Sequence, residues 1–352
     1  MFRNVWCRWR RLWRDLRGGG GVRYHPIAGA GIRVSEVSFG TWTIGGGWGA
    51  VSEADAMDGL RAAMEGGVNF FDTADVYGDG RAERLLARAT REAGRPIHIA
   101  TKFCRAGDIH DPETYGAQRV TQWCERSLQR LGREVIDLYQ IHCPPVEVLR
   151  DGQVFEVLAR LRRDGKIRAY GVSVETVAEG MLCLPTPGRE TGVAALQVIC
   201  NLFRQKPLER LLPACSQAGV AVLARLPLAS GLLTGKFRGD ETFAADDHRS
   251  FNADGQRFNV GETFAGLPFA TGAALAREVA WIAAGRSSMA RAAIRWLLDQ
   301  PGITCAIPGF RHAAQVRDNL AAAAAPPFSA AELDRLRIWY GDRVHAQIRG
   351  AY

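Results

Sequence analysis

Four polar side chains with acid–base chemistry follow apolar runs of the sequence: Asp72, Tyr77, Lys102 and His142. Reduction of a carbonyl group needs a proton for the developing alkoxide, and a phenol can supply it. A free tyrosine has a pKa near ~10, and a nearby ammonium such as Lys102 would lower it. Asp72 would hold Lys102, and His142 would orient the carbonyl oxygen. The four residue types together predict carbonyl reduction with Tyr77 as the proton donor.

Each residue also has a simpler interpretation. Asp72 can cap a turn, His142 can be a buried histidine of the core, and Lys102 can extend toward solvent. Lys102 is also the residue type that forms a Schiff base in a lyase or aldolase. The presence of Tyr77 and Asp72 as partners favours the proton-donor interpretation.

These side chains need a scaffold that brings strand ends together. Apolar runs predict eight strands at residues 34–40, 68–72, 97–101, 136–141, 168–173, 194–199, 220–225 and 303–307. Amphipathic segments predict helices between them, among others at residues 54–65, 121–131, 146–164 and 208–218. The alternation predicts a parallel α/β sheet, and eight repeats favour a single-domain (β/α)8 TIM barrel whose strand ends meet at one mouth. A doubly wound sheet is the alternative.

Two further segments extend this repeat. Residues 229–272 form a long interruption after the seventh strand, and loops of that length are usually functional or mobile. Residues 330–344 predict an extra C-terminal helix. The barrel is therefore expected to carry a long loop near its mouth and a helix outside the eight repeats.

A glycine-rich segment, Gly45 to Ala50, matches the G-x-G-x-x-G/A pattern of dinucleotide-binding folds, and Asp72 follows at about the expected distance. The dinucleotide turn should follow its strand directly. Here residues 41–44 separate the glycines from the strand, which disfavours a Rossmann domain.

Composition fits a large folded domain, with 352 residues of which 47% are hydrophobic. The net charge is +8, but six arginines and one aspartate in residues 1–21 supply +5 of it, so the charge gives little indication of nucleic-acid binding. Eight scattered cysteines lack any Cys-x-x-Cys spacing and predict reduced, buried thiols in a cytoplasmic protein. No apolar run is long enough for a membrane span.

Residues 1–21 form a basic extension that we separate from a barrel domain at residues 22–352. Tryptophans and arginines alternate there at helical spacing, which is compatible with a membrane surface or a transit peptide. Val22 also has the character of a natural chain start, so the extension is either non-native, disordered or membrane-associated.

Several motifs in the same order resemble the aldo-keto reductase family, over about residues 22–329. The matching segments are Phe39–Trp42, Phe71–Gly78, Ala100–Lys102, Gln140–His142, Gly171–Ser173, Pro227–Lys236 and Ile307–Arg311. The resemblance is to bacterial NADP-dependent oxidoreductases. It implies that Asp72, Tyr77, Lys102 and His142 are a catalytic tetrad for the reversible, metal-free reduction of an aldehyde or ketone.

The resemblance further implies that NADPH binds extended across the barrel mouth. Ser173 and Gln197 would hold the nicotinamide carboxamide, and Arg311 would contact the 2′-phosphate. The full implied set is Gly40, Thr41, Trp42, Asp72, His142, Ser173, Gln197, Arg225, Pro227, Leu228, Ser230, Gly231, Lys236, Pro308, Gly309, Arg311, Gln315 and Asn319. Three positions depart from the family, and one of them is Cys200, where many relatives have tyrosine. Val174 replaces a common asparagine, and Arg225 replaces an aromatic residue that stacks on the nicotinamide, as a guanidinium can also do.

The substrate would be a small carbonyl compound lying against Trp42, Trp48, Tyr77 and His142. Further aromatic candidates for the pocket are Phe103, Phe203 and the segment 251–264. Neither the substrate's identity nor the oligomeric state follows from the sequence. A second hypothesis is a cofactor-binding regulatory subunit with little turnover, because some family members serve ion channels in that way.

Overall fold

A parallel barrel is the centre of the computed structural model, which describes residues 22–352. Its strands are β3 (Phe39–Gly40), β4 (Phe70–Asp72), β5 (His98–Phe103), β6 (Ile136–His142), β7 (Ile167–Val174), β8 (Ala195–Ile199), β9 (Ala221–Arg225) and β10 (Cys305–Ile307). Neighbours in the chain are neighbours in the sheet. A parallel bridge between Val37 and Ala306 joins the two edges, and Gly40 N donates to Pro308 O at 3.0 Å. This closure confirms the TIM barrel over the doubly wound sheet.

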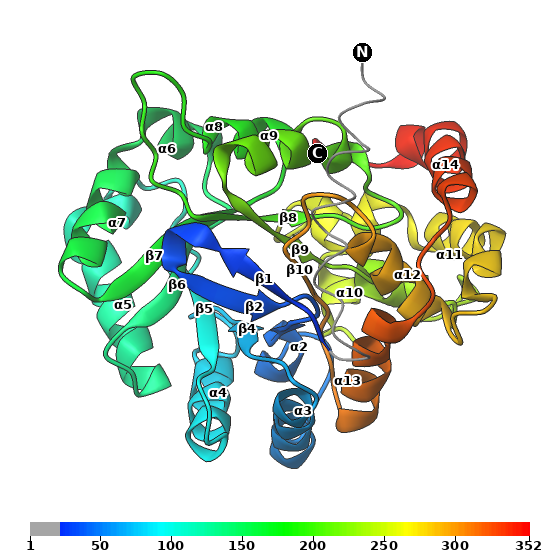
Figure 1. Ribbon diagram of the computed structural model, residues 1–352, viewed down its shortest axis with the longest axis horizontal. Helices are drawn as coiled ribbons and strands as arrows, with labels where there is room; N and C mark the ends of the chain where they lie inside the picture. Colours follow the sequence, from blue (N-terminus) through cyan, green and yellow to red (C-terminus); the bar gives the residue numbers. More distant parts are fainter. Residues whose placement is uncertain (1–21) are drawn as a thin grey trace.

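Amphipathic helices surround the barrel (Figure 1). They include α3 (Glu53–Glu65), α4 (Arg81–Glu92), α5 (Ala117–Leu131), α6 (Val146–Asp151), α7 (Gln153–Arg163), α8 (Val177–Leu182), α9 (Leu211–Ala218), α11 (Phe269–Glu278), α12 (Met289–Leu298) and α13 (Ala313–Leu320). The Ser52 side chain caps α3 by accepting from Asp55 N at 3.0 Å. The single helix predicted at 146–164 is wrong, because Gly152 adopts a φ of 78° and divides it into α6 and α7.

The end of the barrel opposite the strand carboxyl termini is covered by a hairpin. The strand predicted at 34–40 is divided, and its first half, β2 (Ile32–Ser35), pairs antiparallel with β1 (Tyr24–Ile27). Figure 1 shows this dark blue hairpin lying across the barrel strands. Its buried Ile27, Ile32 and Val34 join the inward-facing apolar residues of the strands in one cluster. The hairpin thus leaves the carboxyl end as the open mouth.

The long segment after β9 is an ordered cover rather than a bare loop. Residues 229–268 contain the short helix α10 (His248–Phe251) and several 3₁₀ turns, and α11 begins at Phe269, earlier than predicted. His248, Glu262 and Phe264 of this segment are fully or almost fully buried. We refer to residues 229–268 as the β9–α11 loop.

The remaining predictions about the chain have mixed outcomes. The C-terminal helix exists as α14 (Ala330–Trp339), followed by a π-helical turn to Val344. The seven cysteines of residues 22–352 are buried and form no disulfide, as expected. None of the helices in residues 22–352 is long and apolar enough to cross a membrane. The prediction about residues 1–21 lies outside the described residues.

Candidate active site

Lys102 is the centre of the predicted tetrad in the structure. Its ammonium donates to Asp72 Oδ2 at 2.5 Å, to Thr73 O at 2.7 Å and to Tyr77 Oη at 3.4 Å. The side chain has no exposed surface. Parallel pairing of β4, β5 and β6 brings these groups to one end of the barrel because each follows or ends its strand.

Asp72 is held from its other side by two amides. Gln140 Nε2 donates to Asp72 Oδ1 at 3.1 Å, and Gln197 Nε2 donates to the same oxygen at 2.8 Å. Gln140 was not among the site residues predicted from the sequence. The sequence pattern could have identified Gln140, because it lies two residues before His142 and therefore faces the same side of β6.

The rings of His142 and Tyr77 meet edge to face, with centroids 5.9 Å apart and planes at 82°. Its Nδ1 is buried and has no hydrogen-bond partner among the described residues. Burial, followed by the positive charges of Arg105 and Lys102, holds the pKa of His142 well below its ordinary value. A neutral imidazole at this position can orient a carbonyl oxygen through an N–H but carries no charge near neutral pH.

The pKa of Tyr77 differs from the expectation of a lowered value. Burial raises it above the ordinary phenol value and outweighs the opposing effect of the Lys102 ammonium. Burial also opposes the charge of Lys102, but Asp72 and Tyr77 outweigh burial and raise the pKa of that amine. The phenol is therefore protonated and the amine charged at neutral pH, which are the forms a proton donor and its electrostatic partner require.

The backbone turns sharply just beyond three strands of the mouth. Cys104, Cys143 and Leu226 follow β5, β6 and β9 directly, with φ values of 90°, 54° and 53°. Residues other than glycine rarely adopt positive φ, and such strain is often found at functional sites. These turns lie within two residues of Lys102, His142 and Arg225.

A cavity of about 610 Å³ opens at this mouth. It is lined by Tyr77, His142 and most of the implied cofactor set: Gly40, Trp42, Gln197, Arg225, Pro227, Leu228, Ser230, Gly231, Lys236, Pro308, Gly309, Arg311, Gln315 and Asn319. Thr41, Asp72, Lys102 and Ser173 do not line it; each is at most 3% exposed.

Two of the aromatic candidates for the substrate pocket are wrong. Phe103 stacks on Tyr139 with centroids 4.8 Å apart, and Phe203 packs against Trp339 at 5.9 Å. Both phenylalanines are fully buried and do not line the cavity. An inward-facing aromatic residue and a core residue have the same sequence signature, so only packing distinguishes them.

An aromatic wall borders the cavity beside Tyr77. Trp42 stacks on Tyr77 at 5.9 Å, and Trp48 meets Trp42 edge-on at 5.2 Å. His248 of the β9–α11 loop contacts both tryptophan rings, and its backbone N donates to Gly47 O at 2.6 Å. The glycine-rich segment thus forms a cavity wall after the short helix α2 (Trp42–Gly45), and it does not form a Rossmann turn.

Positive side chains converge at the far end of the cavity. Burial and the nearby charges of Arg249 and Arg311 lower the pKa of Lys236 below its ordinary value. Arg311 Nη2 donates to Ala50 O at 2.9 Å, and Gln315 Oε1 accepts from Arg311 N at 2.8 Å. A region in which positive side chains lie close together is suited to bind an anion such as a phosphate.

Comparisons with known proteins identify the family of this chain. The model of the Aldo/keto reductase family matches residues 36–340. The chain is 31% identical to the aldo-keto reductase YhdN of Bacillus subtilis over 305 residues, covering 84% of this chain and 87% of YhdN. The chain belongs to the Aldo/keto reductase family.

Solved structures of similar proteins share the fold of this aldo/keto reductase. The glycerol dehydrogenase AKR11B4 from Gluconobacter oxydans matches with a TM-score of 0.73 and 30% identity, over 94% of this chain and 98% of that one. An aldo-keto reductase from Klebsiella pneumoniae in complex with NADPH matches with a TM-score of 0.67 and 24% identity, over 92% and 96% of the two chains. Membership places the protein among oxidoreductases.

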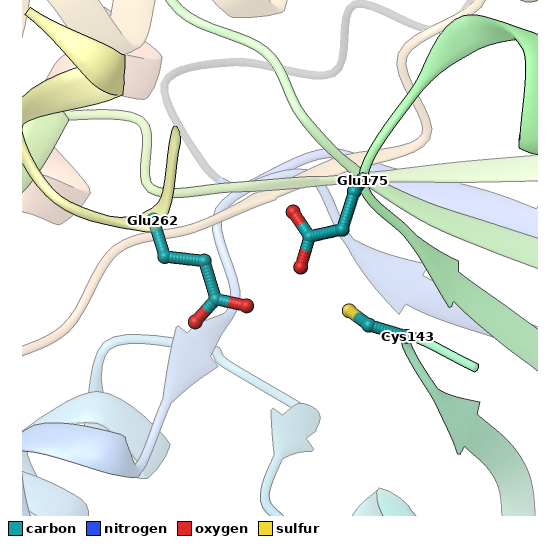
Figure 2. Close-up of side chains that lie close together, drawn as sticks. All are labelled: Cys143, Glu175 and Glu262. Carbon is teal, nitrogen blue, oxygen red and sulfur yellow. The ribbon is translucent and has the colours of Figure 1, made fainter. Parts of the chain in front are cut away.

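A second polar group of this aldo/keto reductase was missed from the sequence. Cys143, Glu175 and Glu262 point toward one another, with ligand atoms within 4.8 Å, a spacing that a metal ion could use (Figure 2). The guanidinium of Arg225 already contacts all three. It lies 2.9 Å from Glu175 Oε2, 3.6 Å from Cys143 Sγ and 3.7 Å from Glu262 Oε1. Arg225, together with Arg105, supplies the positive charge that balances Glu175 and Glu262.

Proposed function

We propose that residues 22–352 reduce an aldehyde or ketone to an alcohol with NADPH, and that Tyr77 donates the proton. The observation that carries the proposal is the contact of one buried ammonium, Lys102 Nζ, with both Asp72 and the Tyr77 phenol at a cavity wall. A phenol beside a fixed cation can transfer its proton because the phenolate that remains is stabilised.

The cavity fits a dinucleotide that carries several phosphates. Lys236 and Arg311 supply positive charge at one end, where Arg249 is paired with Asp247, and the amino terminus of α13 lies beside Arg311. At the other end, Gln197 lines the cavity near the tetrad. NADPH bound in this way would supply the hydride. One solved relative is a complex with NADPH, which supports the choice of cofactor.

The chain's own residues would supply the rest of the chemistry. Tyr77 would give its phenolic proton to the carbonyl oxygen, and Lys102 would stabilise the phenolate. Asp72 keeps Lys102 charged and in place, and Gln140 and Gln197 fix the orientation of that carboxylate. His142, held neutral, would orient the substrate oxygen. Trp42 and Trp48 would provide the apolar wall for the substrate.

Replacement of Tyr77 by phenylalanine tests the proton donor. We expect Tyr77→Phe to lower the rate of NADPH-dependent aldehyde reduction about 10²–10⁴-fold, the usual contribution of a general acid. The affinity for NADPH, measured by fluorescence titration, should change little. Equal rates for the variant and the unmodified enzyme on a panel of aldehydes and ketones would exclude Tyr77 as the acid.

Replacement of Arg311 by alanine tests the choice between NADPH and NADH. The Arg311 guanidinium at the positive end of the cavity should hold the 2′-phosphate that only NADPH carries. We expect Arg311→Ala to raise the KM for NADPH at least about tenfold and to leave that for NADH nearly unchanged. An unchanged ratio of the two KM values would show that another residue selects the cofactor.

A Schiff-base enzyme and a regulatory subunit are the two alternative functions, and each has an assay that would reveal it. A Schiff-base role for Lys102 is disfavoured because the amine is charged against Asp72 and therefore a poor nucleophile. Borohydride trapping with a carbonyl substrate would reveal it. A regulatory subunit with little turnover stays a prediction, and it would bind NADPH without oxidising it in the presence of any aldehyde or ketone tested.

A further inference from the structure

Four charged side chains at the barrel mouth form a closed ring of alternating sign. Arg105 Nη2 lies 2.7 Å from Glu262 Oε1, which lies 3.7 Å from Arg225 Nη1. Arg225 Nη2 lies 2.9 Å from Glu175 Oε2, and Glu175 Oε1 lies 3.4 Å from Arg105 Nη2. Each side chain is at most 13% exposed. We call these four residues the ion ring.

The ion ring borders the place proposed for the nicotinamide. Arg225, Arg105 and Glu262 line the same cavity as Tyr77 and His142. Cys143 also connects the ring to Ser173, the residue expected to hold the carboxamide. The thiol donates to Ser173 Oγ at 3.4 Å, and Arg225 Nη2 donates to the same sulfur at 3.6 Å.

The charge of the nicotinamide differs between its two oxidation states. The oxidised ring is a cation and the reduced ring is neutral, so a positive charge nearby disfavours binding of the oxidised form only. Arg225 alone would have that effect. In the ion ring, two carboxylates balance two guanidinium groups, and the net charge is zero when all four are ionised. Removal of one member leaves an uncompensated charge in a largely buried region, where it is poorly screened.

We propose that the ion ring sets the relative affinity of this enzyme for the oxidised and the reduced cofactor. Arg225, Glu175, Glu262 and Arg105 are positioning residues that act through the charge beside the nicotinamide rather than by proton transfer. The inference rests on the proposed function, because it requires a nicotinamide bound at this mouth. It predicts that substitutions of opposite charge move the affinity ratio in opposite directions.

The test is the ratio of the dissociation constants of NADP⁺ and NADPH, measured by quenching of protein fluorescence. At about pH 8, where Glu175 is ionised, Glu175→Gln leaves a net positive ring and should raise the ratio Kd(NADP⁺)/Kd(NADPH) about tenfold. Arg225→Gln leaves a net negative ring and should lower it about tenfold. A tenfold change corresponds to about 30 mV in the two-electron potential of the bound cofactor.

Two further variants exclude a merely structural effect. The double variant Glu175→Gln/Arg225→Gln restores a neutral ring and should return the ratio to the value of the unmodified enzyme. Asp246→Asn removes one negative charge at an exposed position of the β9–α11 loop and should leave the ratio unchanged. A structural role would weaken binding of both cofactors equally and leave the ratio constant.

The outcomes separate this inference from the proposed function. NADPH binding by the unmodified enzyme, with a ratio that is unchanged or shifted the same way in both single variants, would overturn the inference alone. Absence of NADPH binding by the unmodified enzyme would overturn the proposed function and the inference together. If a single variant does not fold, Glu262→Gln replaces Glu175→Gln and Arg105→Gln replaces Arg225→Gln, because each makes the same change of charge in the ion ring.

Discussion

The tetrad and the ion ring are two buried charge clusters at the same barrel mouth, and they are built differently. In the tetrad, one ammonium meets one carboxylate, and two amides complete the hydrogen bonds of that carboxylate. The ion ring instead balances two guanidinium groups against two carboxylates.

The two clusters also differ in the segments that supply them. The tetrad comes from the neighbouring strand ends of β4, β5 and β6, whereas Arg105 and Glu262 of the ion ring are 157 residues apart in the chain. The comparison suggests that the barrel places the proposed proton donor through neighbouring strand ends, while charge balance around it depends on long-range contacts. The following predictions test that difference.

The largest effect is expected from breaking the tetrad at Lys102. Lys102→Met leaves the Asp72 carboxylate buried without its cation, so the free energy of unfolding should fall by about 3–5 kcal/mol. Carbonyl reduction should fall about 10²–10⁴-fold because the phenolate loses its partner. Denaturant unfolding and steady-state kinetics measure the two effects.

Lys166→Met is the matched control for this variant. Lys166 pairs with Glu125 at the surface, at 2.7 Å, and exposed pairs contribute little to stability. Similar losses of stability and activity in both variants would contradict the assignment of Lys102 as the centre of the tetrad.

A smaller effect is expected from weakening the ion ring at Glu262. Glu262→Gln removes the charge that Arg105 and Arg225 share, and the free energy of unfolding should fall by about 2 kcal/mol. The larger consequence should be local, because Glu262 is the contact of the β9–α11 loop with these two arginines. Limited proteolysis should cut within residues 229–268 faster than in the unmodified enzyme.

The exposed Asp246 of the same loop provides the control for Glu262. Asp246→Asn should leave the rate of cleavage unchanged, since this side chain is at the surface. If Glu262→Gln is cleaved no faster than Asp246→Asn, the ion ring does not hold the loop.

The smallest effect is a pH dependence that we expect from the ion ring. Burial and the negative charge of Glu262 outweigh Arg225 and raise the pKa of Glu175 to about 7, whereas opposing arginines keep the pKa of Glu262 well below its ordinary value. Glu175 also faces Arg105 and the Cys143 thiol. Burial raises the pKa of the thiol, so near neutral pH the thiol stays uncharged while Arg105 stays positively charged. As the pH falls through about 7, Glu175 gains a proton and the ring becomes net positive.

The ratio Kd(NADP⁺)/Kd(NADPH) should therefore rise as the pH falls from 8 to 6. Burial and Glu83 also raise the pKa of Asp75, near Lys102, to about 7, so this carboxyl is a second candidate for the same transition. Glu175→Gln distinguishes the two, because its ratio should be independent of pH. A transition that persists in this variant would assign the effect to another group.

The sequence was informative where function follows from local periodicity. The end of each apolar run placed Asp72, Lys102 and His142 at strand ends, and the barrel rule then brought them to one mouth. The sequence was uninformative where packing decides whether a side chain lies in the core or lines the cavity. Phe103 and Phe203 have the same pattern as pocket residues, yet they lie in the core, and Gly152 divided a helix that hydrophobic periodicity continued.

By itself, the sequence determined the class of fold and nominated the proposed acid–base residues, because strand and helix periods and a few motifs are encoded over short distances. Only the tertiary structure determined the pKa of Tyr77, since burial outweighs the ammonium that alone would lower it. It also determined the ion ring. Glu175 and Glu262 are ordinary polar residues in the sequence, and they acquire a role because the closed barrel and the β9–α11 loop bring Arg105 and Arg225 against them.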